Sequence, residues 1–314
     1  MTLAGSGEKK DFRRHYWQSR YAEFLKDAAK SSSDAWRLRA ICYMAWPLIF
    51  NRVMAFYESF FVSKLLERAC IELKGRAVLD LGCGTGRWCH FFDHFGAQIT
   101  GLDISEEMVA YNRKQFPQWE FIASDISKMP YPGDFFDFVN AAIVLEYVPN
   151  AEKKEVLKEL FRILKPGGSL LVLDPVAAGE GRENDESSCL SVAEWERLLR
   201  NAGFEILAQM PLHAYPLVGV YRRFSKMLGT LIKALKGQGR THEAAHSSGP
   251  EKAAPASAGN PPAMAWRHRL YYELDQWILR ILACFSLLLE GPYLKMGGKG
   301  SHQLFLLRKP LPGK

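Results

Sequence analysis

The sequence predicts an α/β fold, in which a mostly parallel sheet of seven strands is covered by helices on both faces. From Val78 onward, short apolar runs alternate with helical patterns, which is typical of strand–helix–strand units. A glycine-rich turn follows the first apolar run, and acidic residues end the next ones. Ligands bind at this edge of open parallel sheets, so the pattern predicts a binding site as well as a fold.

The expected strands lie near residues 77–81, 98–102, 120–123, 136–142, 169–174, 205–210 and 303–307. Helices are expected between them near 87–95, 106–115, 151–164 and 191–202. The last helix begins at Ser191, and Glu194 stands three residues later in the spacing of a capping box. The run Lys165–Gly168 is expected to end one helix and turn into the next strand, because Pro and Gly interrupt helices.

The chain divides into four predicted parts. Residues 1–75 form a helical N-terminal cover, residues 76–210 form the core, and residues 211–302 form a basic, amphipathic helical insertion before the last strand. Residues 303–314 supply that strand and a tail. Within the insertion, residues 237–262 are rich in Gly, Ala, Ser and Pro and contain no aromatic residue, so we predict a disordered linker there.

The composition is that of a folded protein, with 48% apolar and 24% charged residues in a chain of 314. Its six cysteines form no CxxC pair, so neither a disulfide framework nor a metal site is expected. The N-terminus lacks an apolar signal core, and no apolar run reaches the ~20 residues that span a bilayer. We therefore expect a cytoplasmic location.

The net charge of +7 is concentrated near the C-terminus: residues 1–210 hold 26 Lys and Arg against 29 Asp and Glu, whereas residues 211–314 hold 15 against 5. In residues 218–236, apolar side chains share one helix face and cations share the other, as in helices at a membrane interface. A second helix, expected at 270–289, is apolar nearly all round. The insertion is thus either a lid over the substrate or a contact with a membrane surface, and the two are compatible.

The glycine-rich turn predicts a nucleotide-like ligand, because backbone without a Cβ approaches a ligand closely. Its residues are Asp80, Leu81, Gly82, Cys83, Gly84, Thr85 and Gly86. A dinucleotide fingerprint requires a further glycine at the position that Arg87 occupies, so that a helix can sit close to the pyrophosphate. S-adenosylmethionine has no pyrophosphate, so this departure favours it over NAD.

Carboxylates end the next two strands. Asp103 follows the strand expected near 98–102, where a carboxylate accepts both hydroxyls of a ribose, and Asp125 follows the strand near 120–123. Each alone is an ordinary helix cap or turn residue. Their succession at consecutive strand ends favours a shared ligand site.

In combination, residues 76–210 and the strand at 303–307 resemble the class I S-adenosylmethionine-dependent methyltransferases of the UbiE-like, methyltransferase type 11 group. The resemblance implies a Rossmann-like fold with S-adenosyl-L-methionine as cofactor. The glycine loop would face the methionine part, Asp103 would hold the ribose, Asp125 would meet the adenine beside Ile126, and Ala141 would lie near the sulfonium. The cofactor-binding residues implied are Asp80, Gly82, Cys83, Gly84, Gly86, Asp103, Ile104, Asp125, Ile126 and Ala141, with Tyr16 in an aromatic cover that is alternatively plain helix packing.

Methyl transfer from a sulfonium needs mainly proximity, alignment and a desolvated pocket, so a general base is optional. If the acceptor is a hydroxyl, His213 or Tyr215, just after the sixth strand, could take its proton, although His213 is alternatively an ordinary loop histidine. The family often has His where this chain has Tyr147, which makes Tyr147 a second candidate.

The favoured function is methyl transfer to a small, hydrophobic or lipid-like acceptor. A nucleic-acid methyltransferase is an alternative suggested by the basic C-terminal part, but Ala141–Leu145 lacks the Asn/Asp-Pro-Pro-aromatic motif of enzymes that methylate base amines. A non-catalytic, membrane-associated cofactor-binding module is a third hypothesis. The intact glycines and carboxylates argue against it.

Overall fold

The protein is described by a computed structural model that covers residues 15–22, 24–26, 48–185, 187–213, 289 and 300–313. Residues Met1–Ala214 and Leu294–Lys314 form one compact unit, and the architecture below is that of this unit. Tyr215, the predicted helices at 218–236 and 270–288 and the predicted linker at 237–262 lie outside the described residues.

The elements alternate between strand and helix as the sequence predicts. After a helical segment at residues 15–22 and 24–26, they are α3 (Leu48–Arg68), β1 (Ala77–Leu81), α4 (Arg87–Asp93), β2 (Gln98–Asp103), α5 (Glu106–Gln115), β3 (Glu120–Ala123), β4 (Phe136–Ala142), the 3-10 helix η1 (Leu145–Tyr147), α6 (Lys153–Ile163), β5 (Leu164–Pro175), β6 (Arg182–Glu183), β7 (Ser188–Cys189), α7 (Val192–Asn201), β8 (Glu205–Leu212) and β9 (His302–Arg308).

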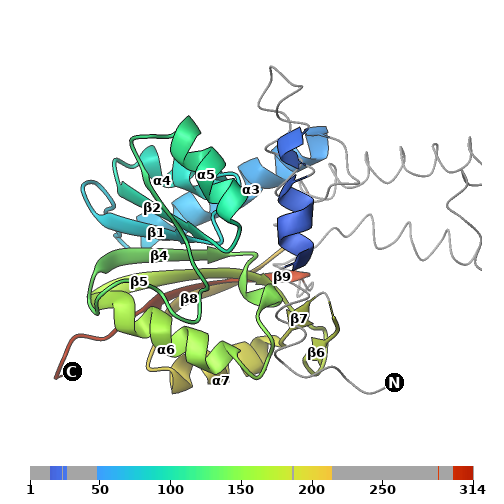
Figure 1. Ribbon diagram of the computed structural model, residues 1–314. Coiled ribbons are helices and arrows are strands. Elements are labelled where there is room, and N and C mark those ends of the chain that lie inside the picture. Colours follow the sequence, from blue (N-terminus) through green and yellow to red (C-terminus); the bar gives the residue numbers. More distant parts are fainter. Residues whose placement is uncertain are drawn as a thin grey trace, which may run out of the picture. The chain divides into compact units, whose positions relative to one another are not determined.

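The main sheet has seven strands in the order β3-β2-β1-β4-β5-β9-β8 (Figure 1). All neighbours pair in parallel except β9, which runs antiparallel to both β5 and β8. The strand order reverses between β1 and β4, since β2 and β3 lie on one side and β5 on the other. The carboxyl ends of strands at such a reversal are where open α/β sheets bind ligands. The predicted Rossmann-like, mostly parallel sheet is confirmed.

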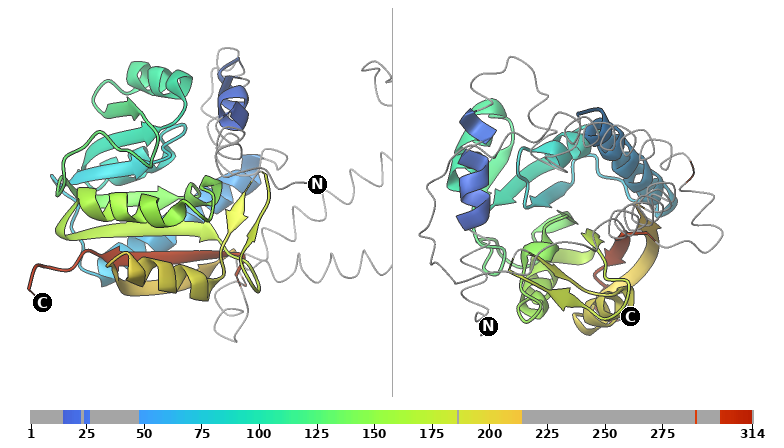
Figure 2. Two further views of the ribbon diagram at one scale, coloured as in Figure 1. Left: turned by 60° about the horizontal axis from the view of Figure 1, so that its bottom comes forward. Right: turned by 90° about the vertical axis from the view of Figure 1, so that its right-hand side faces the viewer.

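Helices bury both faces of this sheet (Figure 2). On one face, α6 and α7 contribute Leu157, Leu160 and Trp195 to a core with the strands. On the other face, α3 and α4 contribute Leu66 and Phe92 to a second core. The sheet is therefore shielded on both sides, which is why its strands read as continuous apolar runs.

Several local expectations need adjustment. The helix before the run Lys165–Gly168 ends at Ile163, as expected, but the run itself already lies in β5, which begins at Leu164 and has an irregular register against β4. The small β6–β7 hairpin was not predicted, since two-residue strands carry no periodicity.

The capping box is confirmed: the Ser191 side chain accepts from the N–H of Glu194, and Glu194 accepts from the N–H of Ser191. No helix within the described ranges is long and apolar enough to cross a membrane.

Candidate functional site

A cavity of about 400 Å³ lies at the carboxyl ends of the parallel strands. Its walls come from the residues that follow or end five strands: Gly82–Thr85 after β1, Ile104 after β2, Asp125–Ser127 after β3, Ala142 in β4 and Pro175 in β5. His213 after β8 and His302 at the start of β9 complete this edge. The volume suits a small ligand, and the position is the one that the strand reversal predicts.

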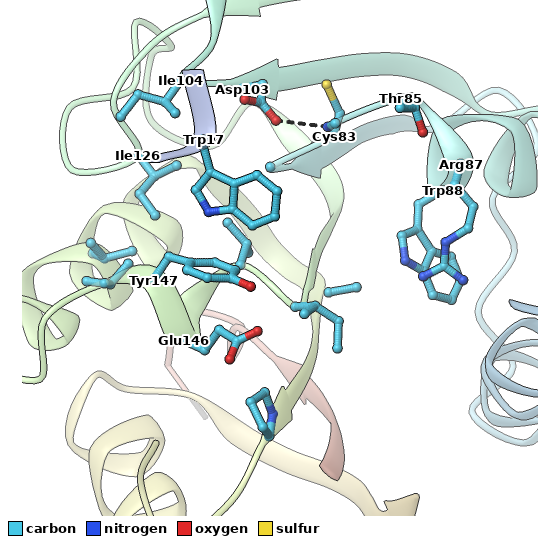
Figure 3. A pocket seen from close by; sticks show the side chains of 18 of the residues that line it. Trp17, Cys83, Thr85, Arg87, Trp88, Asp103, Ile104, Ile126, Glu146 and Tyr147 are labelled. Carbon is cyan, nitrogen blue, oxygen red and sulfur yellow. Dashed lines mark hydrogen bonds between the residues drawn. The ribbon is translucent and has the colours of Figure 1, made fainter. Parts of the chain in front are cut away.

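Asp103 ties the glycine-rich turn to the end of β2. Its Oδ2 accepts a hydrogen bond of 2.8 Å from the N–H of Gly84, and its Oδ1 accepts one of 3.0 Å from the N–H of Ser105 (Figure 3). Burial raises the pKa of Asp103, while these backbone N–H groups oppose the rise. A carboxylate oxygen has room for more than one donor, so this clamp is compatible with hydroxyl groups of a ligand in the cavity.

Gly82 shows why the turn needs glycine. Its φ is +66°, and a Cβ on it would lie 2.5 Å from Cγ2 of Val144. The same turn is fixed from the other side, because Asn112 on α5 donates a hydrogen bond of 2.6 Å to the carbonyl of Gly84. The backbone of the turn is therefore held close to the loop after β4, at the strand reversal.

Asp125 lies on the wall contributed by β3. Its Oδ1 accepts hydrogen bonds of 2.9 Å from the Ser127 N–H and 2.8 Å from the Ser127 hydroxyl, so the side chain is held in place. Ile104 and Ile126 line the cavity next to it, on the same side as Asp103 (Figure 3). Two apolar side chains flanked by two carboxylates can hold a flat, partly polar ring such as a purine.

The aromatic cover is present, but different residues carry it. Trp17 and Tyr21 line the cavity from the helical segment at 15–22, and Trp17 meets Tyr147 edge-on at 5.0 Å between ring centroids (Figure 3). Residues four apart share a helix face, whereas Tyr16 lies on another face and pairs with Arg20. Trp17 and Tyr21, and not Tyr16, are thus the residues of this segment that line the cavity.

Three further residues of the expected set do not line the cavity. Asp80 is 1% exposed, and its oxygens accept from Asn140 Nδ2 at 2.8 Å and from the Cys89 thiol at 3.3 Å. Ala141 packs in the core with residues of α6, because alternate residues of a strand face opposite sides and it is Ala142 that lines the cavity. Gly86, with φ +80°, is the N-cap residue before α4 and lies next to Phe116.

Tyr147, Glu146 and Asp174 lie together near the end of β5. Burial, reinforced by Glu146, raises the pKa of Tyr147 well above its ordinary value, so the phenol stays protonated and donates to Glu146. Burial, again reinforced by Glu146, raises the pKa of Asp174 well above its ordinary value. Both Tyr147 and Glu146 line the cavity (Figure 3). Tyr147 therefore lies at the cavity as a protonated phenol, and its role as a base stays a prediction.

Lys153 fixes the 3-10 helix that carries these residues. The residue is 1% exposed, and its ammonium donates to the carbonyls of Leu145 at 2.6 Å and Val148 at 2.8 Å, and to the hydroxyl of Ser188 at 2.7 Å. Cations bind the carbonyls at the end of a helix favourably. A buried cation thus positions the loop between β4 and α6.

A group of buried charges forms the opposite wall. Glu58 on α3 is 2% exposed, its Oε2 lies 2.6 Å from Arg87 Nη1, and its Oε1 lies 3.2 Å from His213 Nε2. Burial acts to raise the pKa of Glu58, but Arg87 and His213 lower it to about 2, so the carboxylate is ionised. The backbone of His213 is left-handed, with φ +59°, an uncommon conformation for a non-glycine residue that points to a specific local demand. Sequence reasoning named His213 but missed Glu58, whose only signal is a lone acid among the aromatic residues of its helix.

Three features together define the class I S-adenosylmethionine-dependent methyltransferase fold. They are a glycine turn after β1, a carboxylate at the end of β2 that holds this turn, and a mostly parallel sheet in which β9 runs antiparallel. Comparison with known proteins agrees, since residues 78–168 match a methyltransferase domain family. This segment of the chain is a methyltransferase domain of that class.

Curated relatives match part of the chain. A protein of Mycolicibacterium smegmatis described as an S-adenosylmethionine-dependent methyltransferase is 30% identical over 45% of this chain and 56% of its own length. The sterol 4-C-methyltransferase strm-1 of Caenorhabditis elegans is 34% identical over 34% of each chain. The demethylmenaquinone methyltransferase of Listeria welshimeri is 36% identical over 32% of this chain and 45% of its own length. The alignments thus span between about a third and just over half of these relatives.

A solved structure supports the fold over a longer range. A Galdieria sulphuraria protein described as a sarcosine dimethylglycine methyltransferase superposes with a TM-score of 0.50, at 18% identity, over 83% of this chain and 88% of that one. At this identity the likeness concerns the fold. It extends the agreement beyond the matched domain to the helices and strands around it.

Proposed function

We propose that this chain is an S-adenosylmethionine-dependent methyltransferase that acts on a small, hydrophobic or lipid-like acceptor. The observation that carries the proposal is the Asp103 clamp, in which one buried carboxylate holds both the glycine turn and the start of α5 beside a cavity. In this proposal Asp103 accepts the ribose hydroxyls, Ile104 and Ile126 flank the adenine, and Asp125 meets its amine. The cofactor supplies a methyl group that a positively charged sulfur already activates.

The remaining walls support an apolar acceptor. Met54, Trp88, Ile143, Val144 and Pro175 line the cavity beyond the glycine turn. Apolar walls bind apolar groups by removing their surface from water, at about 25 cal/mol per Å². Two relatives are named for a sterol and for demethylmenaquinone, which agrees with an acceptor of this kind. Trp17 and Tyr21 would cover the bound ligands and exclude water from the reacting atoms.

Isothermal titration calorimetry with S-adenosylmethionine tests the cofactor site. Asp103→Ala removes both acceptor oxygens, and we expect its Kd to rise about a hundredfold or more, because hydrogen bonds to a charged group contribute roughly 1.5–3 kcal/mol each. Glu180→Gln is the matched control, since Glu180 is exposed and does not line the cavity. Equal binding by wild type and Asp103→Ala, or no binding by wild type, contradicts the proposal.

The acceptor is identified by incubating the wild-type protein with methyl-labelled S-adenosylmethionine and a total cell extract. The proposal expects label in the fraction that partitions into organic solvent. Label confined to RNA or DNA would instead support the nucleic-acid alternative. No label in any fraction, despite tight cofactor binding, would support the non-catalytic one.

Contact with a membrane surface through residues 218–236 and 270–289 stays a prediction, because apart from Leu289 these residues lie outside the described part of the chain. Co-sedimentation with vesicles of anionic and of neutral lipids tests it. Binding that requires anionic lipid and weakens with salt is the expected result for a basic amphipathic helix.

A further inference from the structure

Three buried side chains form a continuous chain of contacts that leads from the interior to the cavity. Glu58 Oε1 lies 3.2 Å from His213 Nε2, and His213 Nδ1 lies 3.1 Å from His302 Nδ1. His213 is 2% and His302 7% exposed, and all three residues line the cavity. They come from α3, from the end of β8 and from the start of β9, so the fold brings together groups that are far apart in sequence.

The contacts assign the ring protons once His213 is taken as neutral, with its Nε2 facing the Glu58 carboxylate at 3.2 Å. An ionised Glu58 only accepts, so His213 must present Nε2–H to it. A neutral His213 then has a bare Nδ1, and His302 must therefore present Nδ1–H to His213. Ser301 fits the same assignment, since its hydroxyl donates to the carbonyl of His213 at 2.9 Å and its oxygen lies 2.9 Å from His302 Nδ1, where it accepts.

This assignment leaves Nε2 as the unprotonated nitrogen of His302. The hydrogen bonds of His302 within the described part of the chain involve Nδ1, and the residue lines the cavity. A basic nitrogen whose other ring position is held by a histidine and a carboxylate is arranged as in catalytic triads, where the inner groups set the tautomer and orientation of the outer one.

We propose that His302 Nε2 is the general base of the proposed methyltransferase reaction, with His213 and Glu58 as positioning residues behind it. The acceptor class is then a hydroxyl on a hydrophobic body, such as a phenol, an enol or a hydroquinone. This inference rests on the proposed function. In this proposal His302 accepts the proton, in place of His213, the base suggested from the sequence.

The step balances as a relay. The acceptor O–H bond breaks as its proton passes to Nε2 of His302, while the Nδ1–H proton of His302 passes to Nδ1 of His213. The oxygen electron pair forms the new bond to the methyl carbon, and the electrons of the broken carbon–sulfur bond stay on sulfur, leaving a neutral thioether. The positive charge ends on the His213 imidazolium, next to the Glu58 carboxylate.

Proton transfer to His302 depends on passing the charge on to His213. Burial, followed by the nearby His213, lowers the pKa of His302 to about 3, so this ring is neutral before the reaction. A charge that remained on His302 would be costly, but the relay moves it to His213, which faces an ionised carboxylate. Arg87 also contacts Glu58, with its Nη1 2.6 Å from Oε2. The Glu58 carboxylate therefore interacts with two cations once His213 is charged.

Histidine tautomers are read directly by NMR of protein labelled with ¹⁵N-histidine, using long-range ¹H–¹⁵N correlations. The chain has eight histidines, and His302→Asn identifies the signals of residue 302 by their loss. The proposal expects His302 as the Nδ1–H tautomer and His213 as the Nε2–H tautomer, with and without S-adenosylhomocysteine. The Nε2–H tautomer at residue 302 overturns the proposal, whatever the acceptor is.

The kinetic test uses 1,4-naphthohydroquinone as the acceptor probe and labelled S-adenosylmethionine. His302→Asn places an amide near the Nδ1 position but removes Nε2, so we expect kcat to fall about a hundredfold or more, in the range of general-base contributions. The exposed His94 provides the matched control as His94→Asn. Cofactor Kd should change by less than about twofold in both variants, which separates a failed base from a failed cofactor site.

The pH profile distinguishes a base from a residue that merely shapes the pocket. The deficit of His302→Asn should shrink as pH rises toward the ordinary phenol pKa of roughly 10, because hydroxide then ionises the acceptor without the protein. Glu58→Gln should lower kcat about tenfold with little change in KM and show the same recovery at high pH. A deficit that is constant with pH, or full activity of His302→Asn, refutes the proposal. If wild type leaves the hydroquinone unmethylated, the NMR result decides alone.

Discussion

Asp80→Asn is expected to stabilise the folded protein above pH 6 without weakening cofactor binding. Burial raises the pKa of Asp80 from its ordinary 3.8 to about 6, although Asn140 and Cys89 donate to its oxygens and oppose the rise. A folded-state pKa above the unfolded one means that the folded state holds its proton longer, so stability is lost as pH rises from 4 to 6. The difference corresponds to about 3 kcal/mol at neutral pH, at ~1.4 kcal/mol per pKa unit.

An amide at this position removes the buried charge and keeps an oxygen that accepts from Asn140. It loses the thiol hydrogen bond from Cys89, so the net gain expected at pH 8 is about 1–3 kcal/mol, falling to none near pH 3.5, where wild-type Asp80 is protonated. Urea unfolding of both proteins at the two pH values measures it.

Asp137→Asn supplies the control of opposite sign. Burial acts to raise the pKa of Asp137, but Lys165 and the N–H of Ala77 lower it overall, so this carboxylate stabilises the fold near neutral pH. Its amide variant should be less stable than wild type at pH 8. A lower stability of Asp80→Asn at pH 8 would refute the argument from the buried charge. A Kd for S-adenosylmethionine raised more than about threefold would refute a purely structural role and show that Asp80 serves the cavity, as the family resemblance implied.

Other predictions concern the walls of the cavity. Trp17→Ala should raise the Kd for S-adenosylmethionine about tenfold in calorimetry, because it removes the aromatic cover over Tyr147. Tyr16→Ala should change this Kd little. Equal effects of the two variants on the Kd contradict the assignment of the cover to Trp17. Lys153→Met should cost about 3–5 kcal/mol in urea unfolding, because it removes the buried ammonium's hydrogen bonds to the Ser188 hydroxyl and to two carbonyls, at roughly 1.5–3 kcal/mol each. A loss under about 1 kcal/mol contradicts that role. Tyr147→Phe should lower kcat less than tenfold, because a phenol with so high a pKa is no base; a hundredfold loss would restore it as one.

Much of the fold could be predicted from the sequence because its information is local. The alternation of apolar runs and helical patterns located the strands of the parallel part within a few residues, and the Ser191–Glu194 spacing located the start of α7. The ligand edge followed from the glycine turn and the two strand-end carboxylates, and Asp103 and Asp125 do line one cavity.

What the sequence could not predict depends on contacts between distant segments. Asp80 belongs to the glycine motif, yet Asn140, sixty residues away, turns its carboxylate into the interior. Tyr16 and Trp17 are equally aromatic, and only the packing of their helix selects Trp17. Glu58, His213 and His302 carry no motif, because their relation arises from the pairing of β8 with β9 and the position of α3.

The reversed strand β9 has a further consequence for how much the chain can vary between its last two strands. Both the N–H and the hydroxyl of Ser301 donate to the carbonyl of His213, and Gly300 packs so closely on Leu212 that a Cβ would lie 2.4 Å from its carbonyl oxygen. The chain therefore leaves the sheet and returns to it at one place, where hydrogen bonds hold the two ends together. A segment of almost any length is tolerated between two such anchored ends, since loop closure costs little more as the loop grows. Replacing residues 214–299 by a short turn should accordingly leave the seven-stranded sheet and the histidine pair at its rim in place.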